Sequence, residues 1–178
     1  MCHVLALTPQ QRERLSAHLL PDPPVAEEVA FLFARVHAGS EGFVLEVEDL
    51  HLVEDGAFRS RGIAHLQVEH DFIGRMIKRA HDLGTALVEA HSHPFEGLSA
   101  ARFSPSDRAG LAEIVPHVLW RLPGRPYAAL VFAPEGTDGL LWPSHGAEPE
   151  QITELRIGGQ AQRTSLLTLP AWRQHGPL

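Results

Sequence analysis

The middle of the chain alternates between helical and strand-like periodicity, and this alternation constrains the fold more than any other feature. Asp71–Leu83 carries apolar residues at helical spacing, and Gly84 follows at a position where helices commonly stop. Ala86–His91 is a short apolar strand, a second helix runs from Ser104 to about Leu122, and Tyr127–Ala133 is another buried strand. Such alternation is typical of α/β domains.

Further elements are predicted on both sides of this segment. The N-terminal helix begins after a Thr8-Pro9 cap, and Asp55-Gly56 reads as a hairpin turn. The other predicted elements are a helix over Gln10–Leu20 and strands over Val29–His37, Phe43–Val53, Ile63–Val68, Gly139–Trp142 and Ile152–Ile157. This order predicts a mixed α/β domain in which a single curved β-sheet is flanked by helices.

Length and charge narrow the class of protein. The chain of 178 residues suits a single domain spanning residues 1–178. A net charge of −7, from 15 basic and 22 acidic side chains, argues against a nucleic-acid binder. No stretch reads as a membrane span or a signal peptide, and the single cysteine, Cys2, fits a reducing compartment. We therefore expect a cytoplasmic protein without a membrane partner.

A pair of histidines at the end of the central strand is the main candidate for chemistry. Alternate residues of a strand face the same side, so His91 and His93 project together, roughly 6–7 Å apart at the backbone. Two imidazoles at this spacing can share a zinc ion, each at about 2.0–2.1 Å, and Pro94 leaves the strand end open. Asp107, in the first turn of the next helix, is the nearest third ligand. A vacant fourth position would make such a site catalytic.

Each of these residues also has a structural interpretation. Ser104-x-x-Asp107 is a serviceable pair for capping the N-terminus of a helix, and Pro105 stands at the favoured first helical position. An isolated His-x-His pair is often incidental. Capping and metal binding are compatible at Asp107, so we expect both. Glu89 shares the side of the strand with the histidines, and it is a second candidate for a base or for a partner that orients an imidazole.

Together these residues resemble the motif of the JAMM (JAB1/MPN/Mov34) metalloproteases, and the chain is similar to the stand-alone prokaryotic members of JAB type. His91-Ser92-His93-Pro94 matches the core of the motif, and Ser104-x-x-Asp107 follows after a loop. The resemblance covers Glu27 to Trp142 and implies the JAMM/MPN fold, which is cytidine-deaminase-like. One departure is that thirteen residues separate His93 from Asp107, whereas the family usually has ten.

The resemblance also implies roles for particular residues. Zinc would be held by His91, His93 and Asp107 and would activate a water molecule. Glu27 would be the catalytic general base, since Ala30 and Ala34 provide the small residues that the family has after its glutamate. Glu28 is the alternative base, although bulkier residues then occupy those places. The Ser104 hydroxyl would donate to the oxyanion of the tetrahedral intermediate.

The activity implied by the resemblance is hydrolysis of an amide bond. The expected enzyme is a zinc metallo-isopeptidase or peptidase that acts at the C-terminus of a ubiquitin-like protein, in deconjugation or precursor processing. Some prokaryotic relatives accompany ubiquitin-like, E1-like and E2-like proteins, which are therefore the expected partners. Two alternatives are a zinc hydrolase of small amino-acid or peptide conjugates and a catalytically silent MPN-type scaffold.

Overall fold

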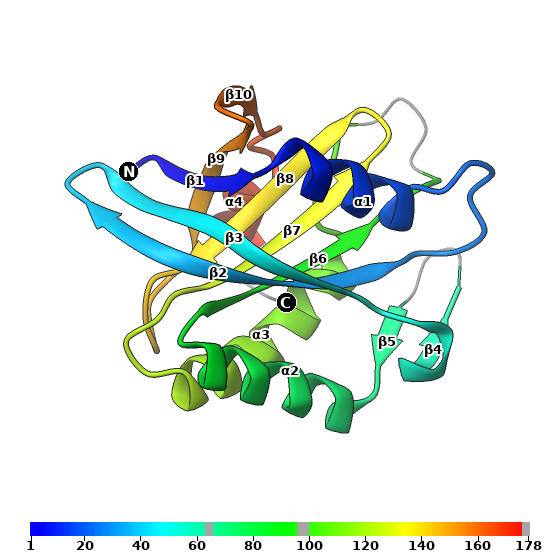
Figure 1. Cartoon of the computed structure of the whole chain (residues 1–178), viewed down its shortest axis with the longest axis horizontal. Helices are drawn as coiled ribbons and strands as arrows, with labels where there is room; N and C mark the ends of the chain where they lie inside the picture. Colours follow the sequence, from blue (N-terminus) through cyan, green and yellow to red (C-terminus); the bar gives the residue numbers. More distant parts are fainter. Residues whose placement is uncertain (63–65, 96–99, 176–178) are drawn as a thin grey trace.

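Seven β-strands close into a barrel in the computed structural model, which describes residues 1–62, 66–95 and 100–175 (Figure 1). The helices are α1 (Pro9–Leu19), α2 (His70–Leu83), α3 (Pro105–Arg121) and α4 (Thr168–His175). The strands are β1 (His3–Leu7), β2 (Val29–Gly39), β3 (Gly42–Leu52), β4 (Phe58–Arg61), β5 (Leu66–Val68), β6 (Ala86–Ser92), β7 (Tyr127–Ala133), β8 (Gly136–Trp142), β9 (Glu150–Ile157) and β10 (Gln160–Arg163).

The closure of the barrel corrects the predicted open sheet. The mixture of helices and strands is as predicted, but the expectation of a single curved sheet flanked by helices, the JAMM/MPN fold that the resemblance implies, is wrong because the sheet closes on itself. The strand order is β1-β3-β2-β6-β7-β8-β9, and β1 pairs in parallel with both β3 and β9, which joins the two ends. The segment that makes this closure, His3–Leu7, lies outside every strand predicted from the sequence.

Side chains on alternate residues form two separate apolar cores. One core collects residues from all seven barrel strands and therefore fills the interior, where Leu15 and Leu19 of α1 also pack. The other core lies on the outside of β2, β6, β7 and β8, against α2, α3 and α4. In β6, Val88 belongs to the inner core and Leu87 to the outer one. Odd-numbered residues of β6, including His91, thus face the helices.

The predicted helices are present, with the predicted caps. Thr8 and Gln11 form a capping box at the start of α1, and Gly84 ends α2 with a φ of 72°. Figure 1 shows α2 and α3 along one side of the barrel and α1 on the opposite side. Among the helices of the described residues, none is both long and apolar enough to cross a membrane.

Two regions differ locally from the prediction. Asp55-Gly56 begins a short 3-10 helix, Asp55–Ala57, instead of a hairpin turn, and β4 then pairs with β5 in a separate two-stranded sheet. The first part of the predicted strand Ile63–Val68 lies outside the described residues. At the C-terminus, β10 and α4 follow β9, whereas Ile152–Ile157 is the last element predicted from the sequence.

Candidate metal centre

The end of β6 presents both histidines on the outer face of the barrel. His91 belongs to the strand, and the backbone N–H of His93 extends its pairing by donating to the Phe132 carbonyl at 2.8 Å. Both histidines are buried, with 6% and 5% of their surface exposed. The ring of Phe103 stands edge-on to the His91 imidazole, with centroids 5.4 Å apart. The strand and this aromatic contact together fix the direction of the His91 ring.

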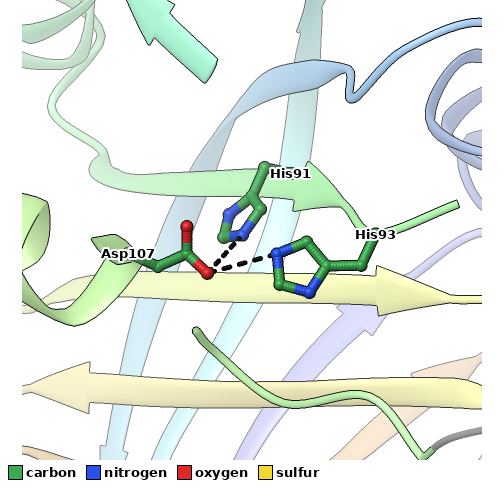
Figure 2. A group of neighbouring side chains, drawn as sticks. All are labelled: His91, His93 and Asp107. Carbon is green, nitrogen blue, oxygen red and sulfur yellow. Dashed lines mark ion pairs between the residues drawn. The ribbon is translucent and has the colours of Figure 1, made fainter. Parts of the chain in front are cut away.

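Asp107 meets the two imidazoles from the first turn of α3 (Figure 2). Its Oδ2 atom lies 3.1 Å from His93 Nε2 and 3.5 Å from His91 Nε2. The potential ligand atoms of the three residues all lie within 4.8 Å of one another. The predicted combination of two imidazoles and one carboxylate is therefore brought together in space, and the three side chains form a group that could hold a metal ion.

The geometry of the group suits a small tetrahedral cation. Bonds of about 2.0–2.1 Å to zinc imply ligand atoms about 3.3–3.4 Å apart, the edge of a tetrahedron. The two measured contacts to Asp107, 3.1 and 3.5 Å, bracket this length. His91 Nε2 is buried and makes no hydrogen bond within the described part of the chain. A buried nitrogen in this condition is costly unless something binds it, and a cation would do so.

The electrostatics of the group also favour a cation. Burial alone would lower the pKa of His91, but the neighbouring Asp107 carboxylate, with Glu89 and Glu27 behind it, outweighs burial and raises that pKa. Burial alone would raise the pKa of Asp107, but His91, His93 and Ser104 hold it far below its usual range. The carboxylate is thus ionised and the imidazoles sit in a negative potential.

Comparison with known proteins does not identify the chain, because no family model and no curated protein matches it. The resemblance to the JAMM motif therefore stays a prediction. What the structure establishes is a His–His–Asp group that could hold a metal ion.

The segment before β2 brings a glutamate to the same place. The Glu27 carboxylate Oε1 lies 3.9 Å from His93 Nε2, and 9% of its side chain is exposed. Ser92 holds this segment against β6, because its hydroxyl accepts the Glu28 N–H at 2.9 Å and its own N–H donates to the Glu28 carbonyl at 3.0 Å. Of the two glutamates weighed in the sequence, Glu27 is the one that contacts the histidines. The role of Ser92 was missed, since its partner is remote in sequence.

Ser104 begins α3 as an N-cap, which confirms the capping prediction. Its hydroxyl accepts the Asp107 N–H at 3.2 Å, and the Asp107 carboxylate accepts the Ser104 N–H at 2.7 Å. The Ser104 hydroxyl also lies 2.9 Å from that of Ser106. The capping box therefore fixes the rotamer of Asp107, so one interaction both starts the helix and aims the carboxylate at the histidines.

Glu89, the second candidate for a base, lies next to the group but is not one of the three residues within ligand distance. The hydroxyl of buried Tyr127 donates to its carboxylate at 3.1 Å, and burial raises the pKa of Glu89. The hydrogen-bond partner of Glu89 is therefore Tyr127, and His91 acts on Glu89 only through its charge.

A buried carboxylate on β8, Asp138, supports the chain before α3. Thr168 Oγ1 accepts the Phe103 N–H at 3.0 Å and donates to Asp138 at 2.6 Å. The Ser165 hydroxyl donates to the Ala101 carbonyl. The C-terminal segment thus holds residues 101–103, which lead into the helix that carries Asp107. Neither Asp138 nor Thr168 is predicted from the sequence, because no local pattern indicates them.

Proposed function

We propose that the chain is a zinc-dependent hydrolase of JAMM type that cleaves the amide bond at the C-terminus of a ubiquitin-like protein. The observation that carries this proposal is the group of His91, His93 and Asp107 with Glu27 beside it, 3.9 Å from His93. Two histidines, one carboxylate ligand and a second carboxylate nearby are the components that metal-assisted hydrolysis requires.

Each residue has a distinct part in the proposed reaction. His91, His93 and Asp107 would hold the zinc ion, which when bound supplies Lewis acidity and lowers the pKa of a water molecule to about 7. Glu27 would take the proton of the attacking water and deliver it to the leaving amine. The burial of Glu27 at 7% exposure keeps its carboxylate fixed and shielded from solvent.

Ser104 would stabilise the developing negative charge. Its oxygen already accepts the Asp107 N–H, which orients the hydroxyl at the start of α3. The hydroxyl hydrogen remains available to a substrate oxyanion, exchanging with the contact to Ser106. Such a donor typically contributes about 3–4 kcal/mol to the transition state.

The substrate class comes from the resemblance of residues 27–142 to the JAMM motif. A ubiquitin-like protein or its conjugate is the proposed substrate, and E1-like and E2-like proteins are the proposed partners. The C-terminal tail of a ubiquitin-like protein is extended and would reach a metal centre at the end of a strand without unfolding.

The test is cleavage of a ubiquitin-like protein carrying a C-terminal fusion, by the zinc-loaded chain and by the metal-free chain. Activity should require zinc and should disappear in His93→Ala. Glu27→Gln should bind zinc at the same stoichiometry and lose about 10²–10⁴-fold in rate. Glu28→Gln is the matched control, because it removes the same charge one residue away and should change the rate little.

Three results would argue against the proposal. Activity that survives His93→Ala would exclude the metal mechanism. A large loss in Glu28→Gln, with Glu27→Gln unaffected, would move the base to Glu28. Stoichiometric zinc binding with no cleavage of the fusion protein or of small amide conjugates would favour the scaffold alternative.

A further inference from the structure

A surface groove of about 620 Å³ lies between α2 and α3 on the outside of the barrel. It is lined by residues of α2 between His70 and Lys78 and by residues of α3 between Ile114 and Arg121, His117 among them. The proposed hydrolytic mechanism uses none of these residues. Figure 1 shows the two helices along one side of the molecule.

The rim of the groove has the opposite charge to the protein as a whole. Three cationic side chains, Arg75, Lys78 and Arg121, line it together with a single carboxylate, Asp71. The chain carries a net charge of −7. Lys78 is paired with Asp82 at 2.5 Å, whereas neither Arg75 nor Arg121 forms an ion pair within the part of the chain that the structure describes. The groove is a local cationic surface on an acidic protein.

The floor of the groove is apolar and open to close approach. Ile73, Ile77 and Ile114 line it, and Ile73 and Ile114 are only partly buried. Gly74 stands in the middle of α2, where a Cβ atom would meet nothing within 4 Å. A glycine at this place costs helix stability, and its lack of a side chain leaves the helix backbone accessible to another chain.

We propose that this groove binds an acidic segment of a partner protein, with an apolar side chain seated on the isoleucines and carboxylates on the arginines. An apolar floor framed by cations complements an acidic amphipathic segment. Nucleic acid fits less well, because a phosphate backbone needs a continuous basic stripe and makes no use of an isoleucine floor. This inference does not depend on the metal centre.

The fluorescence of an exposed tryptophan beside the groove can report binding. Trp120 is 72% exposed and follows His117 by three positions, which puts the two side chains on neighbouring turns of α3. Trp142 and Trp172 are buried and should respond little. A segment bound in the groove is therefore expected to shift the fluorescence of Trp120.

The experiment measures binding of a fluorescein-labelled peptide of glutamate and leucine to the full chain. We expect saturable binding that weakens with salt and a matching shift in Trp120 fluorescence. Arg121→Glu should weaken binding at least tenfold, and so should Gly74→Leu, which fills the groove while improving helix propensity. Thermal unfolding of each variant checks that it is folded.

Controls separate the groove from general effects of charge and surface. Arg14→Glu and Gln10→Leu make comparable changes on exposed positions of α1 and should leave the affinity within about twofold. A peptide of lysine and leucine should not bind. The proposal is overturned by absence of binding, by equal loss in the α1 controls, or by tighter binding of double-stranded DNA that Arg121→Glu abolishes. The proposal is also overturned if the chain self-associates and Arg121→Glu abolishes this association, because the groove would then bind a second copy of the chain.

Discussion

Two carboxylates, Asp138 and Asp107, accept backbone N–H groups at the start of a helix but differ in how many hydrogen bonds they accept. Asp138 has no exposed surface. Its two oxygens accept hydrogen bonds from Gly139 N, Gln151 Nε2, Leu167 N, Thr168 N and Thr168 Oγ1, at 2.6–3.1 Å. Every direction from which a donor can approach this carboxylate is used by the protein itself.

Asp107 has a less complete set of partners. One of its oxygens accepts the Ser104 N–H and faces both imidazoles, and its side chain is 20% exposed. Beside it, the buried His91 Nε2 makes no hydrogen bond within the described residues. Polar atoms of Asp107, His91 and His93 therefore lie close together here, and at least His91 Nε2 among them makes no hydrogen bond within the described residues.

The difference separates a carboxylate whose hydrogen bonds are complete from one that could bind a cation. A buried charge that is fully hydrogen-bonded holds elements together, as Asp138 holds β8, β9 and α4. A buried group with fewer hydrogen bonds can bind a cation, and Asp107 belongs to the group that could hold a metal ion. The same substitution should therefore mainly lower the free energy of unfolding at Asp138 and mainly lower the affinity for a cation at Asp107.

The largest effect on stability is expected from Asp138→Asn. The amide NH₂ must face one of the two sets of donors, so at least two buried donors lose their acceptor. At about 1–3 kcal/mol for each unsatisfied group, the free energy of unfolding should fall by about 2–6 kcal/mol. Chemical denaturation monitored by fluorescence measures it. A loss below 1 kcal/mol would mean that the Asp138 network does not hold the C-terminal segment.

Added zinc should produce the next largest change in the free energy of unfolding, and this change should depend on Asp107 and not on Asp138. Zinc at one hundred times its dissociation constant should raise the free energy of unfolding by about 2.7 kcal/mol. Provided that it folds, Asp138→Asn should gain the same increment from its lower starting point. Denaturation with and without zinc measures both increments. An increment that is present in His91→Ala would place the bound metal somewhere else.

The residues around Asp107 could be predicted from the sequence, whereas Asp138 could not. His91 and His93 follow from the period of a strand, and Asp107 follows from a helix cap, so local rules were sufficient to choose them. Glu27 was selected from a family resemblance, and the structure places its carboxylate beside His93. Asp138 could not be found in this way, because its donors at Leu167 and Thr168 lie 29 and 30 residues away.

The helices and strands of the fold also differ in how far the sequence predicts them. The longer periodic segments, such as α2 and β7, were predicted because each carries its own pattern. The barrel closure was missed because it depends on β1, five residues that pair with β9 near the other end of the chain. β10 is exposed along its whole length and has no apolar alternation to mark it. Local periodicity does not encode which strands meet.

Asp107→Asn sharpens the comparison with Asp138→Asn, since the chemical change is identical. Its side-chain oxygen can still accept the Ser104 N–H, so the cap of α3 should persist. We expect the metal-free protein to lose about 0.5–1.5 kcal/mol, the contribution of a typical hydrogen bond. The increment from zinc should disappear. Denaturation with and without zinc tests both parts, and an undiminished increment would exclude Asp107 as a ligand.

The smallest effect on stability is expected from Ser104→Gly, which leaves the helix start accessible to water. Glycine is tolerated at an N-cap, so the loss should be only a few tenths of a kcal/mol. Thr8→Gly is the matched control, because Thr8 forms the same capping box at α1. Hydrolysis should separate the two variants: if Ser104 donates to the oxyanion, its loss lowers the rate by about 10²–10³-fold, whereas Thr8→Gly leaves it unchanged. Equal rates in both variants would make Ser104 a helix cap and nothing more.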